Sequence, residues 1–208
     1  MQHRIAIFGI LFAIILAWVP YVEALEFNVA VGLSTVRMTA INQQIQLYAD
    51  DHHESIAGIH SAWSLSLGTT LRMSILGVEP CVSGYGLFAS SGSGGGPIQA
   101  TALGVAAGGR YAIGLWDVSA DLGIYRGTFS FPRAAYDVLS GWGIGINGAI
   151  EYTFRLTARI ALGVSLTLRW LTIEQMSDQF GTPYLDRGGP FFDSSGLGVG
   201  ISFRWIAW

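Results

Sequence analysis

The sequence predicts an all-β fold: an eight-stranded antiparallel up-and-down barrel that crosses a membrane, preceded by a cleavable signal peptide. Three observations lead to it. The chain has 208 residues, of which 51% are apolar and only 12% are charged, a composition that points to a membrane or a buried sheet. An apolar run at the N-terminus has the layout of an export signal. The rest of the chain alternates apolar with small or polar residues at period two, which is typical of strands.

The first element is the export signal. Residues 1–4 are a short positive segment, and residues 5–19 are an apolar run of 15 residues, which is short for a spanning helix. Pro20 ends the run, and Val22 and Ala24 stand where a signal peptidase reads small or branched residues. We therefore expect residues 1–24 to be a signal peptide and residues 25–208 to be the barrel, with an uncleaved anchor as the alternative.

Strands are predicted wherever the alternation is sustained. In the clearest run the even positions from Leu156 to Trp170 are apolar, while the odd positions carry Thr, Arg, Ala, Gly and Ser. Two weaker runs are rich in Gly and Ala, and the residues alone leave their phase open; these are 78–88 and 99–111. The eight runs, in chain order, are 25–33, 59–74, 78–88, 99–111, 116–125, 142–152, 156–170 and 197–205.

The connections between these strands alternate in length. Short turns are expected at 75–77, 112–114 and 153–155, and the other four connections are long. Odd-numbered connections of an up-and-down barrel all lie at one end, so every long loop is expected on the same side. One of them, residues 90–97, is a Gly-Ser run that lacks the Lys and the following helix of a phosphate loop, and we expect a flexible hairpin. The long connections are 39–57, 90–97, 127–140 and 171–194.

The apolar face is expected to point outward. The opposite face carries mostly Gly, Ala, Ser and Thr, which suit the cramped interior of an eight-stranded barrel. Exposing the apolar face to water would create a patch far larger than monomers carry, whereas lipid accepts it and barrel closure satisfies the backbone. Aromatic residues near strand ends fit interfacial girdles: Trp116, Trp142 and Trp170, with Tyr152 and Trp205 near the opposite ends.

Ten charged residues fall on the inward face, five acids and five arginines. Buried charges are costly unless paired, and a guanidinium group can bridge carboxylates. We therefore expect an Arg-carboxylate network that fills and plugs the lumen; the alternative is a narrow charged or gated path for small solutes. The ten residues are Glu26, Arg72, Glu79, Arg110, Asp117, Asp121, Glu151, Arg159, Arg169 and Arg204.

Several kinds of chemistry are not expected. A formal net charge of −3, with no Lys in the chain, gives no basic footprint for a nucleic-acid partner. Cys81 is the only cysteine, so an intrachain disulfide is impossible, and we expect it to be a small inward packing residue. We expect no catalytic residue, no metal and no cofactor.

Three histidines of the chain beyond the signal peptide, His52, His53 and His60, are candidates for site chemistry. Residues 50–55 read Asp-Asp-His-His-Glu-Ser and could bind a divalent metal or host a hydrolytic pair built on His52 or His53. A solvated polar loop is the favoured interpretation, because adjacent residues project in different directions and no distant partner stands out. His60 alternates with small inward residues and is expected to form hydrogen bonds in the lumen.

Over residues 25–208 the chain resembles the small outer-membrane barrels of the OmpA, OmpX and OmpW type. The resemblance rests on the strand pattern and not on a specific motif. It implies a cell-envelope protein in the outer membrane, in contact with outer-membrane lipid and, through its C-terminal strand, with the barrel-insertion machinery. Such barrels usually end on an aromatic residue in phase with the last strand. Here Trp205 is in phase and Trp208 is not, so either Trp205 is the signal or a bulge shifts the phase.

Three functions remain open at this point. The first is a structural or surface-interaction role, in which a plugged barrel presents four long loops to extracellular ligands. The second is a narrow porin-like or hydrophobic-solute channel, suggested by apolar loop residues. The third, less favoured, is a lipid-modifying enzyme. The apolar loop residues are Phe180, Tyr184, Phe191 and Phe192.

Overall fold

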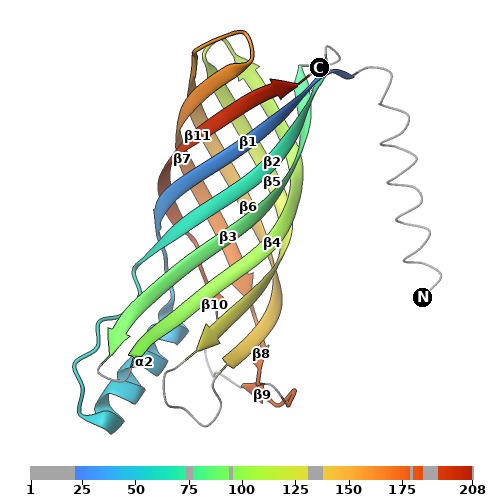
Figure 1. Ribbon diagram of the computed structural model, residues 1–208. Coiled ribbons are helices and arrows are strands. Elements are labelled where there is room, and N and C mark those ends of the chain that lie inside the picture. The colour runs from blue at the N-terminus through green and yellow to red at the C-terminus, as the bar shows by residue number, and fades with distance from the viewer. Residues whose placement is uncertain are drawn as a thin grey trace, which may run out of the picture.

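The computed structural model describes residues 22–73, 77–93, 96–130, 138–178, 180–184 and 192–207, and it confirms the all-β barrel. Eight long strands form the wall (Figure 1). They are β1 (Val22–Thr35), β2 (Ser61–Met73), β3 (Val78–Ser93), β4 (Gly96–Ile113), β5 (Trp116–Ser130), β6 (Val138–Arg155), β7 (Ile160–Ile173) and β11 (Gly196–Ala207).

The wall is closed by antiparallel pairing throughout. Each long strand pairs with its neighbours in the chain, and β1 pairs with both β2 and β11, so that Phe27 lies opposite Trp205. Because every wall strand has two neighbours, the barrel leaves no long strand edge unpaired. This satisfies the backbone hydrogen bonds without help from water.

Alternate residues of each wall strand point in opposite directions. The phase of the two weaker runs is now fixed: Val82 and Val105 are exposed on the outer wall, while Arg110 is buried inside. Large apolar residues are exposed on the outer face of every one of the eight wall strands. Such a surface is far too apolar for water and matches a lipid environment. Among the described residues, no helix is long and apolar enough to cross a membrane.

The two ends of the barrel differ, as the alternating loop lengths predict. The turn end holds the β4–β5 and β6–β7 turns and the end of β11, whereas the loop end holds the longer connections (Figure 1). Within the loop end lie one helix and three short strands, which are α2 (Thr39–His52), β8 (Met176–Ser177), β9 (Pro183–Tyr184) and β10 (Phe192–Asp193).

The first long connection is not the polar loop that the sequence suggests. Residues Thr39–His52 form helix α2, whose Ile41, Ile45 and Ala49 are buried at a spacing of four, so one face of the helix turns inward. The side chain of Asn42 fastens the helix, because its amide nitrogen donates to the carbonyl oxygen of Ile59 at 2.9 Å and its oxygen accepts from the Ile59 nitrogen at 2.6 Å.

Several strand boundaries differ from the prediction, including the 127–140 connection, because β5 extends to Ser130 and β6 begins at Val138. Two other connections change most. Most of the Gly-Ser run at 90–97 continues β3 and β4, with Ser91 paired to Ile98, because the small residues pair as a long hairpin instead of forming a loop. The β6–β7 turn lies at 156–159 and not at 153–155. There the hydroxyl of Thr157 accepts hydrogen bonds from the backbone nitrogens of Arg159 and Ile160, at 3.2 and 3.0 Å.

The interior at the loop end is apolar, which the sequence analysis did not anticipate. We call this group of packed side chains the loop-end core. It combines inward residues of the wall with residues of α2 and of the long connections. Its members are Val36, Met38, Ile41, Ile45, Ile59, Ala62, Leu87, Ala89, Ile98, Ala100, Ala102, Tyr125, Phe129, Leu139, Leu171, Ile173, Met176 and Phe192.

The two ends of the described chain concern the predicted signal peptide and the predicted phase of the last strand. Residues 1–21 of the predicted signal peptide lie outside the described residues, and Val22–Ala24 are the first residues of β1. At the other end, β11 keeps an unbroken register with β1 from Gly198 to Ala207. No bulge shifts the phase over this stretch, which leaves Trp205 as the in-phase aromatic residue of the last strand.

Candidate functional site

All but one of the ten charged residues expected in the lumen lie on the inner face of the barrel. They do not form a single network, however. Seven gather near the turn end in an arrangement that we call the ion-pair cluster: Glu26, Arg72, Glu79, Arg110, Asp117, Glu151 and Arg204. Asp121 and Arg169 lie in a separate group, which is joined by hydrogen bonds.

Arg159 is the exception, and its predicted lumenal position is wrong. The residue lies in the β6–β7 turn with an exposed side chain. The predicted strand was extended back to Leu156 because the alternation continues there, but the Thr157 hydroxyl caps a turn over these residues. Strand β7 therefore begins at Ile160, beyond Arg159.

Glu26 is the centre of the ion-pair cluster. Its side chain is fully buried, and three arginines from three different strands surround it. Arg72 reaches one carboxylate oxygen at 2.8 Å, Arg110 binds the other, and Arg204 lies 3.7 Å from that second oxygen. Strands β1, β2, β4 and β11 are therefore joined inside the barrel by one carboxylate.

Arg204 extends the cluster to the other side of the lumen. Its guanidinium group forms ion pairs with Asp117 of β5 and Glu151 of β6. Hydroxyl groups complete the coordination of these acids, since Thr153 donates to Asp117 at 3.0 Å and Ser202 donates to Glu151 at 2.9 Å. Within the described part of the chain, Glu79 pairs only with Arg110, at 2.6 Å.

Small residues make room for these long side chains. A Cβ atom built on Gly163 would collide with the carboxylate of Glu151 and with the hydroxyl of Ser202. The inward glycine of β7 thus leaves space for an acid of the neighbouring strand, which is a practical use of small inward residues in a narrow barrel. The cluster holds four carboxylates and three guanidinium groups.

The second polar group lies deeper towards the loop end, and we call it the tyrosine cluster; it consists of Tyr85, Asp121, Tyr125, Asn147 and Arg169. Asp121 accepts hydrogen bonds from Tyr85 at 3.0 Å and from Asn147 at 2.6 Å. The same Asn147 nitrogen lies 2.8 Å from the Tyr125 hydroxyl, and the Asn147 oxygen accepts from Arg169 Nε at 3.0 Å. The guanidinium carbon of Arg169 lies 5.9 Å from the centre of the Tyr85 ring.

Three members of this cluster, Tyr85, Tyr125 and Asn147, are not among the residues predicted to form a site. All three stand at inward positions of their strands, so the parity that located the charged residues could have found them too. The aromatic rings also need space. A Cβ atom on Gly104, Gly123 or Gly145 would press into the Tyr125 ring. Glycines on β5 and on both neighbouring strands are therefore a sequence signal for an aromatic ring that points into the lumen.

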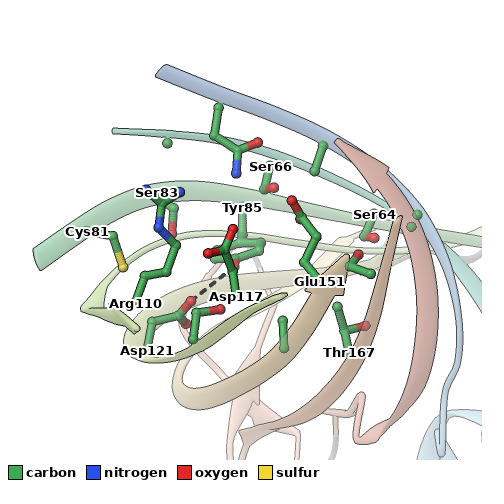
Figure 2. A pocket seen from close by; sticks show the side chains of 18 of the residues that line it. Ser64, Ser66, Cys81, Ser83, Tyr85, Arg110, Asp117, Asp121, Glu151 and Thr167 are labelled. Carbon is green, nitrogen blue, oxygen red and sulfur yellow. Dashed lines mark hydrogen bonds between the residues drawn. The ribbon is translucent and has the colours of Figure 1, made fainter. Parts of the chain in front are cut away.

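A polar cavity of about 130 Å³ lies between the two clusters. Figure 2 shows Arg110, Asp117, Asp121 and Glu151 around it. Cys81 also borders the cavity, as the inward position predicted for it requires. A smaller cavity of about 100 Å³ opens at the turn end, and both cavities are bordered by Arg110, Asp117 and Arg204. The ion-pair cluster therefore separates the two spaces.

Three buried polar atoms facing this interior have no hydrogen-bond partner among the described residues: Asn28 Oδ1, Arg169 Nη1 and Arg204 Nε. All three residues border the larger cavity. A cavity with this many polar groups and this volume is suited to hold water. The lumen is thus polar in its turn-end half and apolar at the loop end.

The histidine-containing candidates do not assemble a site. Asp50, Asp51 and His53 are exposed around the C-terminal end of α2, and nothing is described of the His52 side chain. Within the described part of the chain, no group of three or more His, Cys, Asp or Glu residues could hold a metal ion. His60 precedes β2 and is exposed at the loop end, so the prediction that it lines the lumen is wrong.

Aromatic residues gather on the outer wall near both ends. At the turn end, Trp116 packs edge to face on Tyr152, with ring centres 4.9 Å apart, and Phe27 stacks on Trp205 at 5.7 Å. Trp116 therefore belongs with Tyr152 and not with Trp142 and Trp170, because β5 begins at the turn end. Trp142 lies nearer the loop end, as expected for a second girdle.

Comparison with known proteins supports the fold. No protein-family model matches the chain, and no curated protein is similar to it at a significant level. Among solved structures, the chain is similar to Neisserial surface protein A (NspA), with 11% identity, coverage of 86% of this chain and 95% of that chain, and a TM-score of 0.51. The outer membrane protein OprG from Pseudomonas aeruginosa matches with 12% identity, coverage of 88% and 95%, and a TM-score of 0.43.

Proposed function

We propose that this chain is an integral outer-membrane protein with a structural or surface-interaction role, in which a closed barrel presents its loop end to the outside. The observation that carries the proposal is the filling of the lumen at two levels. The ion-pair cluster fills the turn end and the loop-end core fills the other. A barrel blocked twice is suited to hold loops and not to pass solutes.

The loop-end closure involves large and fully buried side chains. Phe129 of β5, Ile173 of β7 and Phe192 of β10 are each no more than 1% exposed. Close-packed apolar side chains leave no path for hydrated ions, because an ion would have to lose its water without finding a polar partner. This part of the lumen supports a closed barrel more strongly than the ion-pair cluster does.

The membrane location rests on the outer wall. Its apolar residues are exposed on every strand, and barrels with short turns at one end and long loops at the other place the long loops on the extracellular side. In this orientation α2 faces outward from the cell and offers the exposed Leu47, together with Asp50 and Asp51, to extracellular ligands. Export by the predicted signal peptide belongs to the same proposal.

Conductance measured in planar lipid bilayers tests the closed lumen. The full chain is expected to insert without producing discrete current steps. Cys81 gives a second measurement, because it borders the internal cavity and is the only cysteine in the chain. Small water-soluble thiol reagents should modify it slowly in the folded protein and rapidly after unfolding.

A matched control places the thiol at the surface. The double variant Cys81→Ser with Leu47→Cys carries its only thiol on the exposed face of α2, where Leu47 is 61% exposed, and should react quickly. If Cys81 in the wild-type barrel reacts as fast as this control, or if steady current steps appear, the proposed closed lumen is wrong.

A second candidate, a narrow conduit, is favoured by the two cavities that meet at the ion-pair cluster. In that case Arg204 would act as a gate between them. The variant Arg204→Ala should then increase conductance, whereas a closed barrel should lose stability without conducting. The idea of a path for hydrophobic solutes is weaker, since Phe192 is buried in the loop-end core and only Phe180 of the apolar loop residues is described as exposed.

A further inference from the structure

Hydroxyl-bearing residues mark where the apolar outer wall ends on most strands, close to the loop end. On six wall strands, the outward large apolar residue nearest the loop end, or Arg126 on β5, has Ser or Thr two positions nearer that end. On β6 the exposed Val138 lies beyond Ser140, and β11 begins at Gly196 with no outward hydroxyl residue beyond Leu197. We call these six residues, together with Trp142 and Leu197, the boundary ring: Leu33, Trp63, Phe88, Leu103, Arg126, Trp142, Trp170 and Leu197. The hydroxyl residues beyond it are Thr35, Ser61, Ser90, Thr101, Thr128, Ser140 and Thr172.

The strand pairing shows which members of the boundary ring are direct neighbours. Leu33 lies opposite Trp63, and Trp63 lies opposite Phe88. On the other side, Leu103 lies opposite Arg126, which lies opposite Trp142. On β4, β5 and β6 the hydroxyl residues fall at one level, since Thr101 lies opposite Thr128 and Thr128 lies opposite Ser140, as expected where a lipid core meets its headgroups.

Arg126 is the only charged member of the boundary ring. Its side chain is exposed on the outer wall of β5. Towards the turn end its neighbours are apolar, with Ile124 next on the same face, and towards the loop end they are polar, with Thr128 next. Among the described residues no ion pair includes Arg126, and none of the carboxylates described there neutralises it.

The position of this arginine decides what it can bind. A charged residue on the lipid face destabilises the barrel by roughly 2–4 kcal/mol at the middle of a bilayer but by close to nothing at the interface. The guanidinium group of Arg126 in the boundary ring is therefore expected at the level of the lipid headgroups. Trp142, opposite it on β6 and 68% exposed, is the kind of aromatic residue that prefers the same level. The anion available at that level is the phosphate of a lipid headgroup.

We infer that Arg126 and Trp142 form a binding site for the phosphate group of a membrane lipid on the outer wall near the loop end. Arg donates paired hydrogen bonds that match two phosphate oxygens. The indole of Trp142 and the apolar wall around Ile124 offer a surface for the top of the acyl chains. The inference rests on the proposed membrane location and adds a ligand class to the outer wall.

Native mass spectrometry of the full chain in detergent micelles tests the site. The probes are dioleoyl phosphatidic acid and dioleoylglycerol, which have the same chains with and without the phosphate. The wild-type barrel should retain phosphatidic acid over dioleoylglycerol. Arg126→Gln should lower retention of phosphatidic acid about tenfold, since charge-assisted hydrogen bonds of this kind have that magnitude, and should leave dioleoylglycerol unchanged.

The control is Arg155→Gln, which removes an equal charge from an exposed position at the turn end and should leave the retained lipid unchanged. Equal retention by wild type and Arg126→Gln, or an equal loss in Arg155→Gln, would overturn the site. Displacement of the lipid by millimolar inorganic phosphate would also overturn it, because the site would then bind free phosphate. A β-type circular dichroism spectrum and a heat-sensitive gel shift of the same samples show that the barrel is folded. If both are present while the lipid results fail, the lipid site is wrong and the proposed membrane location is not affected.

Discussion

Glu26 is the residue on which the turn-end half of the lumen depends most. Its side chain is fully buried, and Arg72, Arg110 and Arg204 all direct their guanidinium groups to it. Breaking a buried pair by removing one partner is strongly destabilising, because the remaining charge stays buried without compensation. Here one carboxylate serves three cations at once.

Replacing this carboxylate by an amide of the same size isolates the charge. Glu26→Gln is expected to lower the free energy of unfolding by about 3 kcal/mol, measured by urea titration of the barrel in lipid vesicles. The matched control is Glu79→Gln, which removes a less buried carboxylate that has one ion-pair partner, Arg110, among the described residues, and should cost clearly less. Equal effects of the two variants would show that Glu26 is not the centre of the cluster.

The alternation of residues along each strand predicted which charged side chains point into the lumen. Where this prediction is wrong, the cause is local. Glu26, Arg110 and Arg204 were placed correctly because a strand sends alternate side chains to opposite faces. Arg159 was misplaced because the alternation continues for four residues into a turn that the hydroxyl of Thr157 stabilises. Which inward acid meets which arginine depends on strand register, and alternation within one strand says nothing about it.

Helix α2 is the element that most changes the expected architecture. The helix is not predicted from the sequence because six of the 14 residues in 39–52 are Gln, Asn or Asp, which suggest a solvated loop. The spacing of Ile41, Ile45 and Ala49 was nevertheless a readable helical signal. The structure adds what this face packs against, since the buried side of α2 joins the loop-end core with Phe129 and Ile173.

The contribution of α2 can be separated from that of the wall. Ile41→Asp places a charge on its buried face and should detach the helix from the loop-end core, because an unpaired buried charge is costly. Trypsin should then cut after the exposed Arg37 about tenfold faster or more, while the heat-sensitive gel shift of the barrel remains. Leu47→Asp, on the exposed face, should cleave at the wild-type rate; equal rates for both variants would contradict the packing of α2.

On the scale of the whole molecule, the barrel combines a lipid-facing outer wall with a lumen divided into two halves of different chemistry. The turn-end half is held by ion pairs between distant strands, and the loop-end half by apolar packing of wall, helix and long connections. These two kinds of closure respond to different conditions. Charge substitutions act on the first, and loss of apolar volume acts on the second.

The membrane-spanning fold makes a prediction for the intact protein. In detergent it should show a β-type circular dichroism spectrum, and on SDS gels the unheated sample should migrate apart from the boiled one, because a closed barrel resists unfolding by SDS until it is heated. The measurement needs no variant. A helical spectrum, or a monomer that stays soluble without detergent, would contradict the barrel in a membrane.

By itself the sequence determined the barrel, the number of wall strands, the outward direction of the apolar face and the end at which the long loops gather. Period-two alternation and loop length are local properties, so one chain read in order contains them. Only the tertiary structure decided the pairing around Glu26, the tyrosine cluster, the loop-end core and the place of Arg126 in the boundary ring. These features depend on register between strands far apart in the chain, and register is settled by packing across the closed barrel.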